Sequence, residues 1–535
     1  MTEVQIKQFS FQETALATIS DELIVDYPTV YLLNNQKEVY IGETVALKNR
    51  IKQHLKNPAR KQLVDVRVLS HQAFNQSATY NIETKLINYF LADEKYLLQN
   101  KSQTAQSVTH NYYNKNFFDD IVFSDIWRKL LQAGFVNHSA DQIENKDIYK
   151  LSPFKQLSTE QLELKTTIIE RCETHINDAK PFVFFIKGEA GVGKSIILSA
   201  VFNQLQELSQ TKNSPLYQTT NRLLVNHGEM LKTYLKIASQ VKSLKKNNFK
   251  KPTTFINEMK QHQTKADIVL VDEAHLLLSR PDRFNGFQEQ NQLEEIIKHS
   301  KITIVVYDDK QVLKLKSYWD DTKLAQLNVD YTTEAPYVLK NQFRMKANDT
   351  VINWIDAFVK REILPLPTDE NFDFKVFNDA QQLFERIKEK NGAGGLARMV
   401  STFDYQHKKD GATYYVEEGA FKLPWNIVDK ETWAERNTSI NEVGSIYTVQ
   451  GFDLNYVGVI LGPSVSYDEE TGALKIITAH YADTGAFSGK EGFADVEAIK
   501  EQIILNSINV LMKRGIHGLY IYASDPALRA RLAKR

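Results

Sequence analysis

The sequence predicts an α/β protein in which a small mixed-sheet domain is followed by two lobes built on parallel sheets. Three observations lead to this fold class. The chain has 535 residues, which is too long for one hydrophobic core and indicates about three to four globular units. Residues 22–105 begin with a hairpin pattern and continue with helical patterns. From residue 156 onward, short apolar runs alternate with helical patterns, as in parallel sheets buried on both faces.

The order of these patterns predicts five segments along the chain. We expect an N-terminal extension over 1–21, a small domain over 22–105, a connecting segment over 106–155, a first lobe over 156–330 and a second lobe over 331–535. The buried strands of the lobes are predicted at four nearly continuous apolar runs: Phe182–Ile186, Ile268–Val271, Ile302–Val306 and Val457–Leu461.

Composition excludes several classes of protein. Hydrophobic residues make up 42% of the chain and charged residues 25%, which is ordinary for a folded protein in water. No apolar run approaches the ~18 residues needed to span a bilayer, and we expect no secretion signal at the start. The chain has one cysteine, Cys172, which excludes an intramolecular disulfide and a cysteine zinc cluster. We therefore expect a cytoplasmic protein without a membrane partner.

The charge balance limits how the chain could bind nucleic acid. Its 66 Lys and Arg residues equal its 66 Asp and Glu residues, so a global basic field is absent. Binding must then rest on local patches. One candidate patch consists of five lysines: Lys242, Lys245, Lys246, Lys250 and Lys251. The alternative is a solvated lysine-rich loop without a partner.

The small domain gathers polar residues around a predicted hairpin. Two apolar stretches, Val30–Leu33 and Val39–Ile41, are joined by a polar turn and predict two antiparallel strands. A helix follows, and it places Arg50 and His54 four residues apart on one face. A second helical pattern carries Glu83 close to its start.

These side chains suit the hydrolysis of a phosphodiester. Arg50 can bind the phosphate oxygens, and Glu83 can hold a magnesium ion through its carboxylate while water fills the other positions. Tyr31, Tyr40 or His54 can accept or relay the proton of the attacking water. Each residue alone is more often structural, so the hypothesis depends on their combination.

Together these residues resemble the GIY-YIG nuclease family. The family's functional residues fall on Tyr31, on Tyr40 within Tyr40-Ile41-Gly42, and on Arg50, His54, Glu83 and Asn100. The resemblance spans most of 22–105 and implies a mixed-sheet nuclease domain that uses Mg²⁺ or Mn²⁺. The first signature departs from the family, because Thr29-Val30-Tyr31 lacks its glycine. That glycine concerns the backbone and not the chemistry, so we do not expect its loss to inactivate the domain.

A phosphate-binding loop opens the first lobe. Gly188-Glu189-Ala190-Gly191-Val192-Gly193-Lys194-Ser195 matches G-x-x-x-x-G-K-[ST] in full and lies between a predicted strand and a helical pattern. Its three glycines let backbone N–H groups surround the phosphates at a helix N-terminus. Lys194 is expected to reach the β and γ phosphates, and the Ser195 hydroxyl is expected to ligate Mg²⁺.

A strand that ends in acidic residues follows this loop. The run Ile268–Val271 leads directly into Asp272 and Glu273. Asp272 can hold Mg²⁺ through its carboxylate, and Glu273 can orient the attacking water. We therefore expect the first lobe to hydrolyse a nucleoside triphosphate.

Further motifs resemble those of superfamily 1 helicases and occur in the same order. Gln161 corresponds to the glutamine that binds the adenine base, which implies ATP as the cofactor. Gln311 corresponds to the glutamine that senses the γ phosphate. Arg344 and Arg514 correspond to the two arginines that stabilise the transferred phosphoryl group.

One motif narrows this resemblance further. Thr448–Asp453, which includes Gly451, corresponds to the helicase motif that contacts nucleic acid. Its Thr-Val-Gln-Gly-Phe-Asp form is similar to that of a helicase-like group near the Schlafen proteins. The resemblance implies two RecA-like lobes over 156–535. Asp453 and Lys513 depart from residues common in the superfamily, and no long insertion is evident, so we expect translocation in preference to processive unwinding.

Three functions fit these observations. The first is an ATP-dependent enzyme that moves along or remodels nucleic acid, DNA in preference to RNA, and nicks it in defence or repair. The second is an ATP-gated nucleic-acid sensor with a weak or inactive nuclease domain. The third retains the nuclease fold as a protein-interaction module, which would not need the polar set described above.

Overall fold

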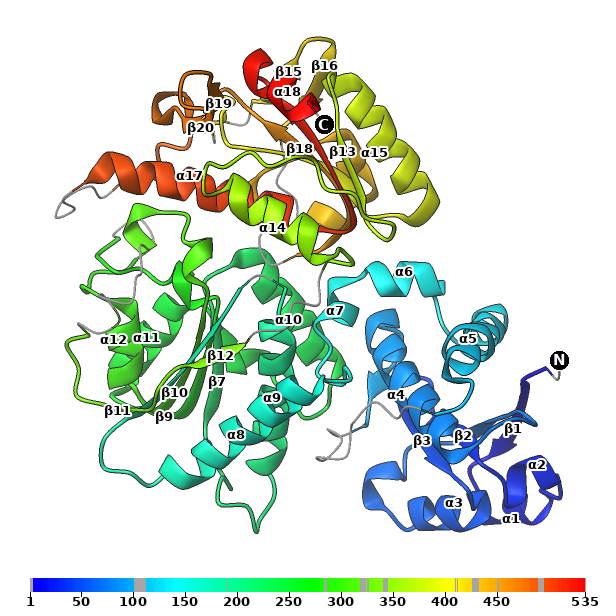
Figure 1. Ribbon diagram of the computed structural model, residues 1–535. Helices are drawn as coiled ribbons and strands as arrows, with labels where there is room; N and C mark the ends of the chain where they lie inside the picture. Colours follow the sequence, from blue (N-terminus) through cyan, green and yellow to red (C-terminus); the bar gives the residue numbers. More distant parts are fainter. Residues whose placement is uncertain are drawn as a thin grey trace. The chain divides into compact units, whose positions relative to one another are not determined.

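A computed structural model of the protein describes residues 3–100, 112–189, 191–282, 286–317, 324, 327–339, 345–408, 410, 412–425, 433–449, 452–488 and 495–534. The chain divides into two compact units. The first comprises Met1–His175, Ser195–Asn221 and Thr233–Phe249. The second comprises Ile176–Lys194, Arg222–Lys232 and Lys250–Arg535. Figure 1 labels the elements of both units.

The first unit begins with the predicted mixed sheet. Its strand order is β1-β4-β2-β3-β5, and every pair is antiparallel except β3 with β5. The predicted hairpin is formed by β2 and β3. The strands are β1 (Gln5–Ser10), β2 (Thr29–Asn34), β3 (Glu38–Thr44), β4 (Asp65–Ser70) and β5 (Leu97–Leu98).

The sheet extends into residues that we assigned to an N-terminal extension. Strand β1 pairs with β4 from Gln5 opposite Ser70 to Ser10 opposite Asp65. Its sequence, Gln-Ile-Lys-Gln-Phe-Ser, carries no continuous apolar run, so it gave little signal as a strand. The small domain therefore includes residues before position 22.

Helices cover this sheet and continue into the connecting segment. Helix α3 (Leu47–Leu55) buries Leu47 and Ile51, and helix α4 (Gln76–Asp93) packs against β2 and β3. Two short helices precede them, α1 (Glu13–Ala17) and α2 (Glu22–Val25). The connecting segment is partly helical. It holds the π-helical turn η2 (Phe117–Val122), α5 (Phe123–Gln132), α6 (Ala140–Asn145) and α7 (Asp147–Lys150), and α8 (Thr159–His175) follows.

The first lobe contains a seven-stranded sheet of order β11-β6-β10-β9-β7-β8, with β12 also paired to β6. Strand β10 pairs in parallel with β6 and with β9, as predicted. The strands are β6 (Phe182–Gly188), β7 (Asn221–Val225), β8 (Phe249–Lys250), β9 (Ala266–Asp272), β10 (Ser300–Tyr307), β11 (Thr332–Thr333) and β12 (Tyr337–Leu339). Because β11 and β12 follow residue 330, this sheet extends past the expected boundary. The helices are α9 (Lys194–Leu208), α10 (Gly228–Gln240), α11 (Pro252–His262) and α12 (Gln292–Lys298).

The second lobe has a five-stranded parallel sheet of order β13-β21-β18-β14-β17. These strands are β13 (Asp373–Val376), β14 (Ala397–Ser401), β17 (Val443–Gly444), β18 (Leu454–Leu461) and β21 (Gly515–Ala523). Two hairpins add β15 (Tyr415–Glu418) with β16 (Phe421–Pro424) and β19 (Val465–Asp468) with β20 (Ala473–Ile476). The helices are α14 (Asp349–Phe358), α15 (Ala380–Gly394), α16 (Ile446–Val449), α17 (Val496–Met512) and α18 (Pro526–Ala533). The predicted fold class is thus confirmed. Among the described residues, none of the helices has the length and apolarity to traverse a bilayer.

Candidate functional site

The hairpin of β2 and β3 brings the two signature tyrosines together. Tyr31 is fully buried and lies opposite Gly42 in the antiparallel register. A Cβ at position 42 would lie 2.3 Å from the hydroxyl oxygen of Tyr31, so the phenol occupies the space above the glycine. The ring centroids of Tyr31 and Tyr40 are 6.3 Å apart. Gly42 is therefore required for the phenol of Tyr31 to cross the hairpin.

Helix α3 supplies two polar side chains to the hydroxyl of Tyr31. The Nε2 atom of His54 lies 2.8 Å from this hydroxyl, and the Nε atom of Arg50 donates to it at 3.3 Å. Burial, and then the charges of Arg50 and Arg60, lower the pKa of His54 to about 4. The imidazole is therefore neutral at pH 7 and can accept the phenolic proton. The structure thus brings together the predicted Tyr31, Tyr40, Arg50 and His54.

Two carboxylates lie near this set, and only one of them was predicted. Burial, and then the neighbouring carboxylate of Glu43, raise the pKa of Glu83 to about 8, although Arg50 opposes the shift. Glu43 accepts a hydrogen bond from the Thr79 hydroxyl at 3.4 Å, and burial raises its pKa as well. No group of three or more His, Cys, Asp or Glu side chains suited to a metal is found in the described parts of the chain. A metal here would therefore be held by few protein oxygens.

The predicted Asn100 has a structural contact. Its side-chain oxygen accepts from the backbone N–H of Ile41 at 3.1 Å, and its Nδ2 donates to the Ile41 carbonyl at 2.8 Å. Ile41 lies between Tyr40 and Gly42 in β3. Asn100 thus fixes the part of strand β3 that carries Tyr40 and Gly42.

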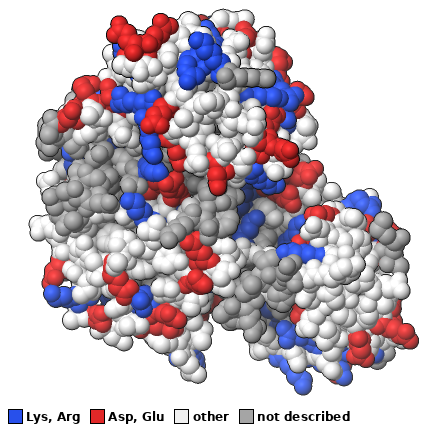
Figure 2. Space-filling model, in the orientation of Figure 1, with Lys and Arg blue, Asp and Glu red and all other residues white. Residues whose placement is uncertain are grey.

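A second arginine, which the sequence analysis did not single out, covers Tyr40. The guanidinium carbon of Arg60 lies 3.8 Å from the centroid of the Tyr40 ring, and Arg60 also donates to the side chain of Gln99. The available signal was charge: residues 44–64 contain six Lys and Arg residues but neither Asp nor Glu. Figure 2 shows basic side chains along the lower edge of the N-terminal domain, where Figure 1 draws α3.

Two of the five lysines in the predicted patch lie close to carboxylates of the chain. Lys242 lies 3.8 Å from a carboxylate oxygen of Glu38, and Lys250 is paired with Glu258. Lys245, Lys246 and Lys251 are exposed. The surface around α3 is therefore the stronger candidate for a basic patch.

The phosphate loop has the conformation its glycines predict. Gly191 and Gly193 have φ values of 90° and 80°, which side-chain-bearing residues rarely adopt. The Nζ atom of Lys194 donates to the carbonyls of Gly188 and Glu189, at 2.8 Å each. Ser195 follows at the start of α9. The ammonium group of Lys194 is thus held by backbone carbonyls of the same loop.

Acidic residues at the ends of β9 and β10 lie close to this lysine. A carboxylate oxygen of Asp308 is 3.6 Å from Lys194 Nζ. Glu273, in a left-handed conformation with a φ of 52°, lies 2.9 Å from Nε2 of His275. Burial opposes ionisation of Glu273, but the charges of His275, Lys194 and Arg514 outweigh it and lower its pKa. Asp272 is buried, and its carboxylate accepts from the N–H of Glu273 at 3.0 Å.

Hydrogen bonds connect the phosphate loop to the second lobe. Gln311 donates through Nε2 to Asp308 at 2.7 Å, and its Oε1 accepts from Arg514 at 3.3 Å. Arg514 is fully buried and also donates to the carbonyls of Val510 and Phe452. A continuous series of side chains therefore joins Lys194, Asp308, Gln311 and Arg514. Asp308 was not among the predicted site residues, although it lies three residues before the predicted Gln311.

A neighbouring lysine makes a second connection between the lobes. The Nζ atom of Lys513 lies 2.6 Å from a carboxylate oxygen of Asp356 and 3.6 Å from one of Glu189 in the phosphate loop. Lys513, like Asp453, departs from the residues common in the superfamily 1 helicases that the sequence resembles. Its contacts show that the substituted position faces the loop.

Three predicted residues cannot be placed at the ATP site. Arg344 and Gly451 lie outside the described residues. Gln161 is buried, and its Oε1 accepts from the backbone N–H of Ser158 at 3.0 Å while its own N–H donates to the Ser158 hydroxyl at 3.3 Å. These two bonds cap the start of α8. A role of Gln161 at adenine stays a prediction.

Comparisons with known proteins agree with the helicase-like part of the chain. A family model described as Schlafen group 3, DNA/RNA helicase domain, matches residues 181–525. An uncharacterized protein of Saccharomyces cerevisiae is 41% identical over 411 residues, which cover 71% of this chain and 90% of the yeast protein.

Solved helicase structures are more distant. The crystal structure of arterivirus nonstructural protein 10, a helicase, is 11% identical over 69% of this chain, with a TM-score of 0.29. The match spans 64% of the length of the viral chain. The Pif1 helicase of Candida albicans is 12% identical over 71% of this chain and 97% of its own, with a TM-score of 0.27.

Proposed function

The chain belongs to the Schlafen group 3 family of DNA/RNA helicase domains, and we propose that it is an ATP-dependent nucleic-acid-processing enzyme with a second, endonuclease centre in its N-terminal domain. The observation that carries the nuclease half is the hydrogen-bonded set of Tyr31, His54 and Arg50 in the same domain as Glu83. Packing alone would not require these polar groups in a hairpin core. The substrate we propose is DNA.

The residues of the first lobe fit ATP bound with Mg²⁺. In our proposal Lys194 binds the β and γ phosphates, and Ser195 and Asp272 hold the ion. Bound Mg²⁺ would neutralise charge on the phosphate oxygens. Glu273, which its cationic neighbours keep ionised, orients the attacking water. Gln161 binds the adenine base.

The arginines make hydrolysis depend on both lobes. Arg514 would stabilise the negative charge that spreads over the γ-phosphoryl oxygens, and Gln311 would hold it in place. We propose Arg344 as the second such arginine and Gly451 as part of the nucleic-acid contact. Because Arg514 comes from the second lobe, loss of the γ phosphate changes how strongly the lobes attract each other. That change can move the lobes along a strand.

In the N-terminal domain, the direction of the hydrogen bonds suggests a proton relay. The Nε–H of Arg50 can only donate, so the Tyr31 oxygen accepts from it. The phenolic hydrogen is then free to point at Nε2 of the neutral His54. Tyr31 could therefore pass a proton from the attacking water to His54, while Arg50 stabilises the phosphate charge. Tyr40 lies beside both rings and could assist the same transfer.

The carboxylates fit a hard divalent cation. The pKa of Glu83 is raised by burial and by Glu43, and a cation would relieve both effects. We propose that Glu83, with Glu43 beside it, holds Mg²⁺ or Mn²⁺. The bound ion would polarise the phosphate and lower the pKa of its water. The basic residues of 44–64 would hold the backbone of the DNA next to the site.

A plasmid-nicking assay with Mg²⁺ and ATP tests the nuclease half. We expect supercoiled plasmid to be nicked, and we expect Glu83→Gln, which preserves side-chain size, to lower the rate by about 100-fold. The matched control is Glu13→Gln, an exposed carboxylate of the same domain, which should cut like wild type. Equal nicking by Glu83→Gln and wild-type protein would rule out the nuclease.

ATPase rates test the motor half. Single-stranded DNA, duplex DNA and RNA are added in parallel to the wild-type protein and to Lys194→Ala. We expect DNA to stimulate hydrolysis by the wild type, and we expect no turnover by Lys194→Ala. A rate that no nucleic acid changes would contradict a translocase.

The raised pKa of Glu83 favours a second candidate, an ATP-gated sensor whose nuclease domain is weak. With a pKa of about 8, the carboxyl is mostly protonated at pH 7 and competes poorly for a metal ion. In this case DNA would bind in an ATP-dependent way, ATP turnover would be slow and unstimulated, and no nicking would appear at pH 7 or 9. Nicking that appears at pH 9 would exclude the sensor.

A further inference from the structure

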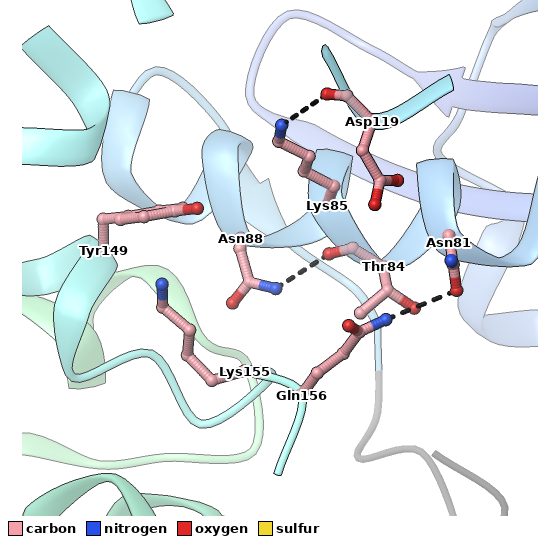
Figure 3. Close-up of a pocket in the computed structure, with 8 residues that line it drawn as sticks. All are labelled: Asn81, Thr84, Lys85, Asn88, Asp119, Tyr149, Lys155 and Gln156. Atoms are coloured by element: carbon pink, nitrogen blue, oxygen red, sulfur yellow. Dashed lines mark hydrogen bonds between the residues drawn. The ribbon is translucent and has the colours of Figure 1, made fainter. Parts of the chain in front are cut away.

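A polar pocket lies on a different face of α4 from the one that carries Glu83. Four of its lining residues follow one another on α4 at helical spacing: Asn81, Thr84, Lys85 and Asn88. Asp119 of η2, Tyr149 of α7 and the following Lys155 and Gln156 complete the wall. Figure 3 shows these eight side chains around the pocket. Nothing in the proposed ATPase or nuclease mechanisms uses them.

The chemistry of the wall selects a small polar ligand. None of the eight lining residues is aliphatic, and Tyr149 is the one aromatic ring among them. The cavity has a volume of about 320 Å³. Small-molecule sites generally measure about 300–1,000 Å³, so this pocket suits a compact ligand.

Two ammonium groups in the pocket form no ion pair among the described residues, although the charges of Glu144, Asp119 and Asp120 act on Lys85 and the charge of Glu144 acts on Lys155. Nζ of Lys85 donates to the backbone carbonyl of Asp119 at 2.8 Å and lies 4.3 Å from the centroid of the Phe123 ring. Nζ of Lys155 lies 3.6 Å from the centroid of the Tyr149 ring. A buried cation is normally paired with an anion, because burial removes its hydration. These two lysines therefore provide charge for an anion from outside.

The pKa of Lys155 agrees with this interpretation. Burial lowers the pKa of Lys155 to about 8, although the charge of Glu144 opposes the shift. Glu144 itself is bonded to the hydroxyl of Tyr89. An anion bound beside Lys155 would raise the pKa of this lysine again.

Acceptors in the same pocket indicate a ligand that also carries donors. Asn88 is 5% exposed, and its Nδ2 donates to the carbonyls of Thr84 and Phe154 at 2.8 and 3.1 Å. These bonds fix the orientation of the amide and leave Oδ1 buried without a hydrogen bond among the described residues. The carboxylate of Asp119 is a second acceptor. A ligand hydroxyl would satisfy either group, whereas a bare anion would not.

We propose that this pocket binds a phosphate monoester that carries hydroxyl groups, a ligand of about the size of a sugar phosphate or a nucleoside monophosphate. Lys85 and Lys155 bind the phosphate, and Asn88 and Asp119 accept hydrogen bonds from the hydroxyls. The same chemistry occurs in a free sugar phosphate and at the phosphorylated 5′ end of a nucleic-acid strand. The proposal does not depend on the nuclease or on the motor.

Calorimetric titration of the full chain tests the proposal. The background variant is Lys194→Ala, which removes the phosphate-loop lysine as a competing phosphate site. The probes are ribose 5-phosphate and a tetranucleotide with either a 5′ phosphate or a 5′ hydroxyl. We expect Lys155→Met in this background to weaken binding by about tenfold or more. Lys37→Met, an exposed lysine of the same domain that lies outside the basic segment 44–64, should leave binding unchanged.

A second readout separates ion pairing from a structural effect. At pH 8, binding should take up protons from the buffer, because the ammonium of Lys155 is only about half protonated before an anion arrives. The uptake should vanish in Lys155→Met. If Lys155→Met unfolds at a lower temperature than the wild type, Gln156→Glu is used in its place. This substitution adds a negative charge to the pocket lining at nearly constant side-chain size and should also weaken binding of the phosphate.

The probes also distinguish the two sources. Tighter binding of ribose 5-phosphate supports a free metabolite, and tighter binding of the tetranucleotide with the 5′ phosphate than of its 5′-hydroxyl form supports a strand end. Equal affinities of the Lys155→Met and Lys37→Met proteins would overturn the proposal. The proposal would also be overturned if none of the probes bound at millimolar concentration.

Discussion

Two glutamates of this chain have opposite electrostatic surroundings. Glu83 has the carboxylate of Glu43 as its neighbour, and burial with that charge raises its pKa to about 8. Burial acts in the same direction on Glu273, but His275, Lys194 and Arg514 outweigh it and lower the pKa of Glu273. The difference lies in the neighbouring charges, because burial alone acts to raise the pKa of both residues.

The contrast indicates where each centre obtains positive charge. The ATPase centre carries its own cations, and one of them comes from the second lobe. The N-terminal centre has two carboxylates, and the cations near them are arginines bound to tyrosines. A metal ion would therefore add the charge that the N-terminal centre lacks. The predictions below test this difference in order of expected effect.

The largest effect should follow from removing the cation of the second lobe. We expect Arg514→Ala to lower ATP turnover by about 10³-fold, because the arginine stabilises charge that develops on the transferred phosphoryl group. Binding of a fluorescent ATP analogue should persist. Steady-state hydrolysis measures the effect, and Arg529→Ala, a lobe 2 arginine bonded to Tyr522, is the control. A near-normal rate for Arg514→Ala would contradict its role.

The second effect concerns metal binding at Glu83. We expect the affinity for Mn²⁺ to rise by about tenfold per pH unit from pH 6 to 8 and then to level off, because one proton must leave Glu83. Calorimetric titration without nucleotide measures this dependence. Glu43→Gln should lower the pKa of Glu83 and move the rise to lower pH. A pH dependence that survives in Glu83→Gln would assign the proton to another group.

The same group affects stability without metal. Folding raises the pKa of Glu83 from 4.5 to about 8, so the folded state holds a proton that the unfolded chain has released. Its contribution to stability is therefore fully present below about pH 4.5 and is lost as the pH rises to about 8. Urea denaturation measures the free energy of unfolding of wild type and Glu83→Gln as a function of pH. We expect it to fall more steeply between about pH 4.5 and 8 in the wild type, and parallel profiles of the two proteins would refute this role of Glu83.

The third effect concerns the glycine beneath Tyr31. We expect Gly42→Ala to lower the free energy of unfolding by about 3 kcal/mol, because the new Cβ would lie 2.3 Å from the Tyr31 hydroxyl. The control is Gly392→Ala in α15, where no atom lies within 4 Å of an added Cβ. That exposed substitution should instead add about 0.5–1 kcal/mol. Equal free energies of unfolding for the two variants would mean that the phenol of Tyr31 can move away from the added Cβ.

The smallest effect should follow from removing Asn100. We expect Asn100→Ala to cost about 1–2 kcal/mol, because the backbone N–H and carbonyl of Ile41 lose their partner. Nicking should weaken through misplacement of Tyr40, and added metal should not restore it. Rescue by excess Mn²⁺ would assign Asn100 to the metal site instead.

Much of the fold was predictable because its signals are local. Buried parallel strands give continuous apolar runs, and four of these runs became β6, β9, β10 and β18. The phosphate loop is a contiguous motif, and so is the hairpin that carries Tyr31 and Tyr40. For such elements, adjacent residues contain the whole pattern.

The missed features depend on contacts between distant residues. Glu43 gains its importance from Glu83, 40 residues later, and no pattern near position 43 indicates that contact. Arg60 matters because it covers Tyr40, and β1 exists because β4 offers it an edge. Asp308 became notable through its distance from Lys194. Such relations follow from tertiary structure and are absent from local sequence.

The last strand of the first sheet has a mechanical consequence. Strand β12 pairs in parallel with β6, and its final residue, Leu339, lies opposite Gly188, the first residue of the phosphate loop. A Cβ on Gly188 would come within 3.2 Å of the Cβ of Leu339, so loop and strand are in close contact. The chain leaves the first sheet at this residue to enter the second lobe. A shift of the loop as it binds or releases a nucleotide would therefore also displace Leu339, the last residue of β12.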